Sequence, residues 1–105
     1  MLVEALESDA DLRRVFFSKL QLMLYGGAGL PQPLFDRLQG LAEQETGRRI
    51  FMTTGYGATE TTSGCMSIYF MSEKVGIGLP MPGLSVKMVP IDSERYELRM
   101  KGEMV

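Results

Sequence analysis

The run TTGYGATETTSG, residues 53–64, holds three side chains within five positions that could act together on a nucleotide. Tyr56 could stack a purine on its ring face, Thr59 could donate its hydroxyl to phosphate oxygens, and Glu60 could ligate Mg²⁺, a hard cation that prefers carboxylate oxygen. Backbone amides near Gly57 would help to hold the anion. The alternative is structural: the glycines form a turn, the tyrosine packs on a sheet, and the glutamate is solvated.

A second glycine-rich run, GGAG at residues 26–29, is open to the same two interpretations. It forms a tight turn from a strand into a helix, or it offers a backbone without side chains against which a flat ligand ring can lie. It is not a dinucleotide fingerprint, because Gln32 stands where G-x-G-x-x-G requires its third glycine. The sequence contains no GK[ST], so a Walker phosphate loop is excluded as well.

Cysteine and histidine chemistry is largely excluded by composition. The sequence has one cysteine, Cys65, and no histidine, so an internal disulfide, a zinc site built on histidine and a histidine-dependent triad are ruled out. We do not expect Cys65 to be a nucleophile, because no base stands near it in the sequence.

Charge and hydropathy limit the partners of the chain. Thirteen acidic and eleven basic residues leave a net charge of −2, which disfavours binding to nucleic acid or to an anionic membrane surface. The longest apolar runs fall far below the roughly 20 residues that span a bilayer, and no signal-like segment occurs. We expect a cytoplasmic protein with no membrane span.

Two helices are predicted ahead of the glycine-rich runs, within residues 2–20. Apolar residues recur there at helical spacing, and Ser8 and Asp9 are placed to cap a second helix after a short first one. The second helix is predicted to bury a stripe formed by Leu12, Val15, Phe16 and Leu20.

A strand, a helix and a second strand then follow in the order of a parallel βαβ unit. The first is a short buried strand that ends near Tyr25, and the helix begins at Pro31 or Pro33 and stops at Gly47. One face of this helix carries Leu34, Leu38, Leu41 and Ala42. Residues 48–55 form the second strand, so both glycine-rich runs follow carboxyl ends of strands, where ligands gather in such sheets.

An antiparallel hairpin is predicted after Gly83, because residues 84–90 and 95–101 alternate apolar with polar side chains. The segment VGIGLPMPG, residues 75–83, separates the βαβ pattern from this hairpin pattern. We therefore expect an α/β fold, with a partial parallel sheet and flanking helices over residues 1–75 and antiparallel β structure over residues 76–105.

Four ordered motifs resemble the adenylate-forming (AMP-binding) superfamily. They are YGGAGLP at 25–31, TTGYGATET at 53–61, VGIGLPMPG at 75–83 and ELRMKGEMV at 97–105. The superfamily includes acyl-CoA and aryl-CoA synthetases, luciferases and peptide-synthetase adenylation domains. The details are most similar to feruloyl-CoA synthetase-like and other carboxylate–CoA ligases, and the resemblance implies that residues 76–105 begin a small β-barrel subdomain.

The resemblance implies an adenine site on the first two motifs. Gly26, Gly27 and Ala28 match the family's adenine-contacting loop, and adenine would lie between this loop and Tyr56. Gly29 stands where many members of the family have proline. The chain thus departs from the family pattern within the loop itself.

The resemblance also implies the catalytic and substrate-contacting residues. It places Thr59 at the phosphates and Glu60 on Mg²⁺, which makes them the expected catalytic pair, and it places Gly57 in the nucleotide-binding turn. Thr54 and Gly55 would border the pocket for the carboxylate substrate. The implied reaction uses ATP to convert an acyl or aryl carboxylate into its acyl-adenylate, and then transfers the acyl group to CoA.

Other parts of the family's site have no counterpart in this sequence, namely the phosphate loop, the ribose-binding aspartate and the catalytic lysine. We therefore expect a fragment of a longer ligase that shows negligible pyrophosphate exchange alone, with Lys87 and Lys101 solvated in the hairpin. Exposed strand edges would favour a homodimer, which a monomeric mass at high concentration would contradict. The alternative is a non-catalytic nucleotide-binding or interaction module that keeps the fold.

Overall fold

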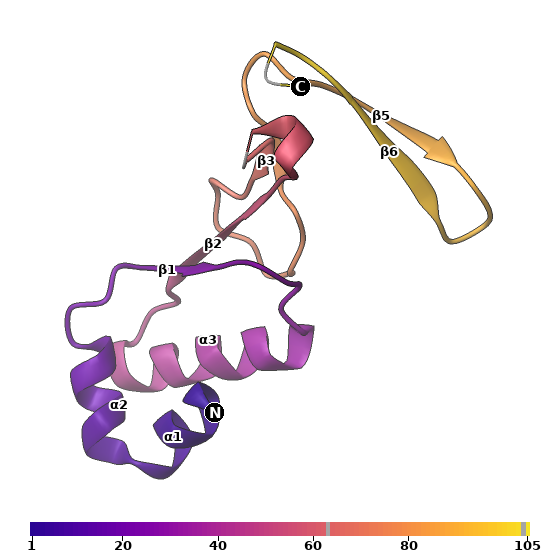
Figure 1. The fold of residues 1–105 in the computed structure, drawn as a ribbon. Coiled ribbons are helices and arrows are strands. Elements are labelled where there is room, and N and C mark those ends of the chain that lie inside the picture. Colours follow the sequence, from indigo (N-terminus) through magenta and orange to yellow (C-terminus); the bar gives the residue numbers. More distant parts are fainter. Residues whose placement is uncertain (63, 104) are drawn as a thin grey trace.

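A computed structural model describes residues 1–62, 64–103 and 105. Over these residues the expected α/β class is confirmed, with three α-helices, a mixed four-stranded sheet and a separate antiparallel hairpin (Figure 1). The elements are α1 (Leu2–Ser8), α2 (Ala10–Phe17), β1 (Leu22–Tyr25), α3 (Gln32–Thr46), β2 (Phe51–Tyr56), the 3-10 turn η1 (Thr59–Thr61), β3 (Met66–Ser67), β4 (Leu79–Pro80), β5 (Ser85–Pro90) and β6 (Tyr96–Lys101).

The predicted βαβ unit is present and carries the centre of the sheet. β1 pairs with β2 in parallel, from Leu22 opposite Phe51 to Tyr25 opposite Thr54, and α3 connects the two strands. β3 then pairs antiparallel with the end of β2, and β4 pairs antiparallel with β3. The sheet order β1-β2-β3-β4 therefore brings β4 back toward the carboxyl end of β2.

Helix α3 begins and ends where the sequence predicts. Pro33 lies in its first turn, where a missing N–H costs nothing, and Gly47 ends it in the left-handed conformation with φ 75°. The buried Gln39 side chain donates to the carbonyl of Ile50 at 2.7 Å and accepts from its N–H at 2.9 Å. Both polar ends of this amide are thus satisfied, and they fix the start of β2 against the helix. Among the described helices none is long and apolar enough to span a bilayer.

The core lies between α3, the two shorter helices and the inner face of β1 and β2. It consists of Val3, Leu6, Phe17, Phe35, Leu38, Leu41, Ala42, Ile50 and Met52. The helices stack on one side of the parallel strands, with α3 next to the sheet and α1 and α2 beyond it (Figure 1). This one-sided arrangement corrects the prediction that β1 is a buried strand: Leu24 is 70% exposed, because no described helix covers the outer face.

The predicted buried stripe of α2 is wrong at two positions. Leu12 and Val15 are exposed, Phe16 and Leu20 are half-buried, and Phe17 enters the core in their place. Asp9 caps the helix as predicted, and its carboxylate accepts from the N–H of Leu12 at 3.0 Å. The helix therefore forms where predicted, but a different side of it packs against the core.

Arg13 holds this orientation of α2. Its guanidinium donates to the carbonyl of Leu6 at 3.1 Å and to the carboxylate of Glu45 at 2.6 Å. The side chains of Arg13 and Glu45 are only 13% and 20% exposed, so the pair is shielded from solvent. The arginine thus joins the end of α1 to the end of α3 from the side of α2 that faces the core.

The predicted hairpin is formed by β5 and β6, and burial alternates along β6 from Glu97 to Lys101, whereas in β5 Met88 is exposed and Val89 is half-buried. The Asp92 carboxylate in its turn accepts from the backbone N–H groups of Glu94 and Arg95, at 3.0 and 2.8 Å. The bond from Glu94 and the ion pair with Arg95 hold the pKa of Asp92 below its usual value. Lys87 and Lys101 are exposed, as expected.

The hairpin extends away from the rest of the molecule (Figure 1). No residue of either of its strands is buried, and the Cα radius of gyration is 16.6 Å, against about 13 Å for a compact domain of this size. The boundary expected near residue 76 stays a prediction, since β4 lies beyond it in sequence yet still pairs with β3.

Candidate functional site

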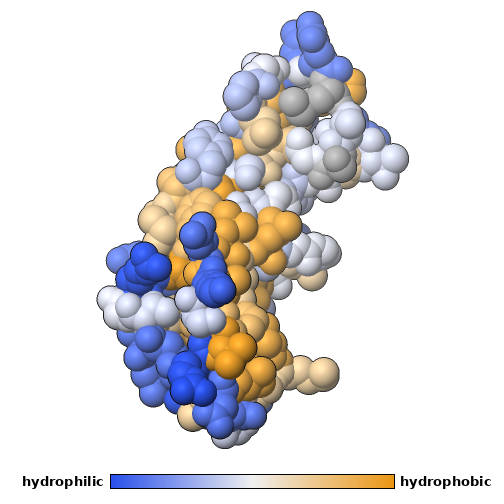
Figure 2. Space-filling view, turned by 90° about the vertical axis from the view of Figure 1, so that its left-hand side faces the viewer, coloured by the Kyte–Doolittle hydropathy of each residue, from blue (hydrophilic) through white to orange (hydrophobic). Residues whose placement is uncertain are grey.

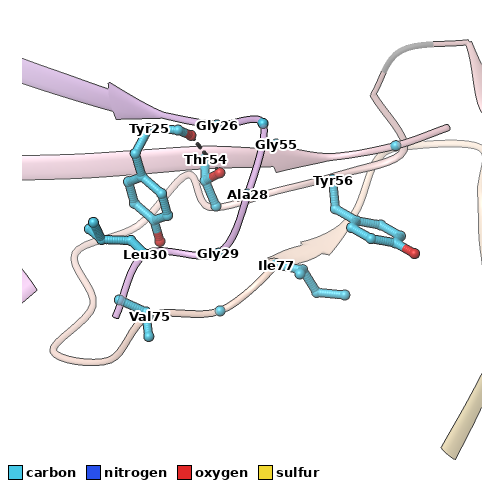
Figure 3. Close-up of a pocket in the computed structure, with 13 residues that line it drawn as sticks. Tyr25, Gly26, Ala28, Gly29, Leu30, Thr54, Gly55, Tyr56, Val75 and Ile77 are labelled. Atoms are coloured by element: carbon cyan, nitrogen blue, oxygen red, sulfur yellow. Dashed lines mark hydrogen bonds between the residues drawn. The ribbon is translucent and has the colours of Figure 1, made fainter. Parts of the chain in front are cut away.

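A cavity of about 470 Å³ opens at the carboxyl ends of the parallel strands β1 and β2 (Figure 3). Three segments line it, residues 25–30 after β1, residues 54–57 at the end of β2, and residues 75–77 before β4. The volume lies within the range of small-molecule sites. No lining residue carries a charge, so the cavity suits an uncharged, flat portion of a ligand.

The two glycine-rich runs lie side by side at this cavity, as predicted. The Thr54 hydroxyl donates to the carbonyl oxygen of Tyr25 at 2.6 Å and thereby ties the end of β2 to the end of β1. Gly27 has φ 83°, a left-handed conformation that favours glycine. At Gly26, by contrast, a Cβ would meet nothing within 4 Å, so the protein itself does not exclude a side chain there. Space left open at this glycine fits a ligand lying against the backbone.

Tyr56 ends β2 and forms the opposite wall of the cavity (Figure 3). It is 43% exposed, so part of its surface is accessible to a ligand. Its carbonyl oxygen accepts from the backbone N–H of Cys65 at 2.8 Å and from the Cys65 thiol at 3.1 Å. Cys65 is fully buried and supports this turn.

Residues 75–77 form the third wall, which the sequence motifs did not predict as part of the site. The Gln32 side chain holds it in place, since its amide donates to the carbonyl of Glu73 at 3.0 Å and accepts from the N–H of Val75 at 2.9 Å. In the sequence this wall belongs to the glycine-rich segment VGIGLPMPG, which predicts only a connection between the α/β part and the hairpin. The pairing of β4 with β3 that returns this segment to the cavity is a long-range contact that local patterns do not encode.

Thr59 and Glu60 lie on η1, directly after the tyrosine turn, and both are exposed. Neither is among the residues that line the cavity. The buried Thr61 hydroxyl accepts from the N–H of Ala58 at 2.8 Å and donates to its carbonyl at 3.1 Å, which closes the short helix. Glu60 makes no hydrogen bond or ion pair with any other described residue, so its carboxylate is free for a ligand.

The predicted site residues thus fall into two adjacent groups. Those that line the cavity are Gly26, Gly27, Ala28, Thr54, Gly55, Tyr56 and Gly57. Thr59 and Glu60 stand outside its wall on the next turn of the chain. Residues that line the cavity without having been predicted are Tyr25, Gly29, Leu30, Val75, Gly76 and Ile77.

The described residues contain no group of three or more histidine, cysteine, aspartate or glutamate side chains arranged to hold a metal ion. Mg²⁺ does not need such a cage, because it keeps several waters and takes one or two carboxylates together with substrate phosphates. The solvated, unpaired carboxylate of Glu60 fits that mode of binding. Bound there, the ion would neutralise phosphate charge.

Comparison with known proteins adds one finding. A family model described as "AMP-binding enzyme" matches residues 1–105, the full length of the chain. No curated protein sequence matches the chain.

Proposed function

Because the chain belongs to the AMP-binding enzyme family, we propose that its residues serve in an ATP-dependent carboxylate–CoA ligase. In that reaction a carboxylate oxygen of the substrate attacks the α-phosphorus of ATP, and pyrophosphate leaves. The CoA thiol then attacks the acyl carbon of the acyl-adenylate, and AMP leaves. The observation that supports the proposal is the cavity that joins the glycine loop after β1 to Tyr56 at the end of β2.

The proposal assigns the adenine ring to this cavity. The ring lies against the backbone of Gly26, Gly27 and Ala28, and Tyr56 covers its other face. An uncharged lining supports this assignment, since the base is the uncharged flat part of the nucleotide. Gly57 contributes backbone to the same turn.

The charged part of the nucleotide is assigned to the turn beyond the cavity. Thr59 donates its hydroxyl to phosphate oxygens, and Glu60 ligates Mg²⁺. Both side chains are exposed beside the tyrosine turn, which supports a position next to the base rather than under it. Thr54 and Gly55 border the carboxylate substrate.

The substrate class is proposed as an acyl or aryl carboxylate, and CoA as the acceptor of the acyl group. The support for this branch is the resemblance of the four motifs, and the family match itself does not single out feruloyl-CoA synthetase-like enzymes. We expect these residues to act together with a phosphate loop and a lysine that this sequence does not supply.

The role of Glu60 is tested by the variant Glu60→Gln, which removes the charge and keeps the shape. ATP affinity of the 105-residue chain should rise when Mg²⁺ is added, because the ion bridges phosphate and carboxylate oxygens. In Glu60→Gln that rise should fall by roughly tenfold, the effect of losing one charged contact. Isothermal titration calorimetry with and without Mg²⁺ measures both quantities.

A matched control is Glu94→Gln, which makes the same charge change in the exposed turn of the hairpin. It should leave the response to Mg²⁺ unchanged. Equal responses to Mg²⁺ in the unmodified chain and in Glu60→Gln would contradict the assignment of Glu60.

A further inference from the structure

A second cavity, of about 240 Å³, lies where the ends of α2 and α3 meet the starts of β1 and β2, on the left in Figure 1. Phe51 lines this second cavity, whereas Tyr56 at the other end of β2 lines the larger one. A strand rises about 3.3 Å per residue, so these two residues are about 17 Å apart along β2. The second cavity is therefore separate from the site proposed for the nucleotide.

The inner part of the second cavity is apolar and partly aromatic. Phe17 and Ile50, which line it, are buried, and Phe51 is half-buried. A cavity of about 150 Å³ holds benzene, so this larger volume has room for one ring and one small substituent. A ring placed here would remove apolar surface from water, which a small inorganic ion would not do.

The same cavity is lined by two arginines, Arg48 and Arg49, whose charge is poorly compensated. Arg48 is exposed, and its guanidinium makes no hydrogen bond or ion pair with any other described residue. Arg49 approaches the Glu43 carboxylate only to 3.8 Å, and both side chains are open to solvent, so this pair is weak. Glu45, the next acidic residue of α3, is held by Arg13 at 2.6 Å.

The end of α3 does not use these two cations. Arginine after a helix often serves the helix itself, by bonding to its last carbonyl groups. Here the carbonyl of Ala42 accepts from the Thr46 hydroxyl at 2.7 Å, and that of Glu43 accepts from the N–H of Gly47 at 2.8 Å. Within the described part of the chain the two guanidinium groups therefore remain available for an anion from outside.

We propose that the second cavity binds a small aromatic carboxylate. The ring lies against Phe17, Ile50 and Phe51, and the carboxylate pairs with Arg48 and Arg49. A guanidinium suits this partner, because its N–H groups form a fork that matches the two oxygens of a carboxylate. The inference is independent of the proposed function, since it uses no residue of the nucleotide site, and it involves no chemical step.

The test uses benzoate as the probe and two-dimensional NMR of the isotope-labelled 105-residue chain. Benzoate should cause saturable shifts of backbone amides in residues 20–21 and 46–51, which belong to or adjoin the lining of the second cavity. Benzyl alcohol keeps the ring without the charge, and acetate keeps the charge without the ring. Each should bind at least about fivefold more weakly than benzoate, because each lacks one of the two kinds of contact.

The variant Arg48→Gln should bind benzoate about fivefold more weakly, the effect of losing one exposed charged contact, and Arg49→Gln should weaken binding as well. The melting temperature of Arg48→Gln should not change, since its guanidinium has no partner among the described residues. Lys87→Gln removes the same charge from the exposed hairpin and is the control, with unchanged affinity for benzoate.

Equal benzoate affinity in the unmodified chain and in Arg48→Gln would overturn the inference. Binding of benzyl alcohol as tight as that of benzoate would overturn it too, because the arginines would then play no part. Benzoate shifts confined to residues 26–30, 54–57 and 75–77 would also overturn it, and would leave the proposed function intact.

Discussion

Gly78 is the residue that allows β4 to lie directly against β3 beside the cavity. Its φ is 86°, and a Cβ at this position would lie 2.1 Å from the carbonyl carbon and oxygen of Ser67 and 2.6 Å from the nitrogen of Ile68. These atoms belong to backbone of the neighbouring chain segment, so no rotamer change can relieve the contact. The glycine is thus required by both conformation and space, and it lets β4 approach β3 closely enough to pair.

The variant Gly78→Ala should therefore lose at least about 2 kcal/mol of unfolding free energy, because the backbone of β3 and β4 must separate. Gly76→Ala is the matched control, since a Cβ there meets nothing within 4 Å and φ is not positive. It should change stability little. Urea denaturation of both variants measures the difference, and comparable losses would show that packing at Ser67 is not the cause.

At the residue scale the sequence identified the cavity-lining glycines and Tyr56 but not Tyr25. The glycines and Tyr56 can be recognised in the sequence, because glycine-rich runs beside an aromatic residue indicate a turn at the end of a strand. Tyr25 looked like an ordinary strand residue. Only the three-dimensional arrangement shows that its hydroxyl is buried without a partner.

At the scale of elements, the amino end of α3 positions the third wall of the cavity. Gln32 is its first residue, and its side-chain amide bonds to both Glu73 and Val75. A single side chain therefore couples the helix that crosses between β1 and β2 to a loop more than forty residues later in the sequence. Cavity shape depends on this coupling.

The variant Gln32→Ala should release the segment 73–77 and weaken AMP binding several-fold, with a loss of about 1–2 kcal/mol in unfolding free energy for two hydrogen bonds. Gln44→Ala, on the exposed side of the same helix, should alter neither property. Calorimetric titration with AMP and thermal denaturation measure the two effects. Tight AMP binding by Gln32→Ala would mean that residues 75–77 do not contribute to the site.

The positions of the helices in the sequence were largely predictable, but the side of each helix that is buried was not. Proline, glycine and capping residues mark the ends of α2 and α3 because they act on the local backbone. The buried face of α2 was predicted wrongly because Arg13 turns inward to reach Glu45 and the carbonyl of Leu6. Amphipathic patterns count apolar residues and cannot anticipate an ion pair with a partner thirty-two residues away.

At the scale of the whole molecule, apolar surface and strand edges remain open. Apolar side chains form a broad area on the face shown in Figure 2. Large apolar residues that are exposed in the helices and the sheet include Leu12, Val15, Leu22 and Leu24. Such surfaces commonly mark contacts with further protein, either another segment or a second copy. Self-association stays a prediction.

The arrangement of the molecule also separates two possible ligand positions. The cavity at the carboxyl ends of the parallel strands is lined without charge, whereas a smaller one of about 240 Å³ lies beside Arg48 and Arg49, just before β2 begins. A nucleotide bound through its phosphates alone would favour the arginines. A nucleotide bound through its base should favour the glycine loop and Tyr56.

Two-dimensional NMR of the isotope-labelled chain titrated with AMP distinguishes these two positions. We expect saturable shifts of backbone amides concentrated in residues 26–30, 54–57 and 75–77, the three walls of the larger cavity. Shifts concentrated at residues 48–51, or no saturable shifts at all, would contradict the claim that the adenine base lies between the glycine loop and Tyr56.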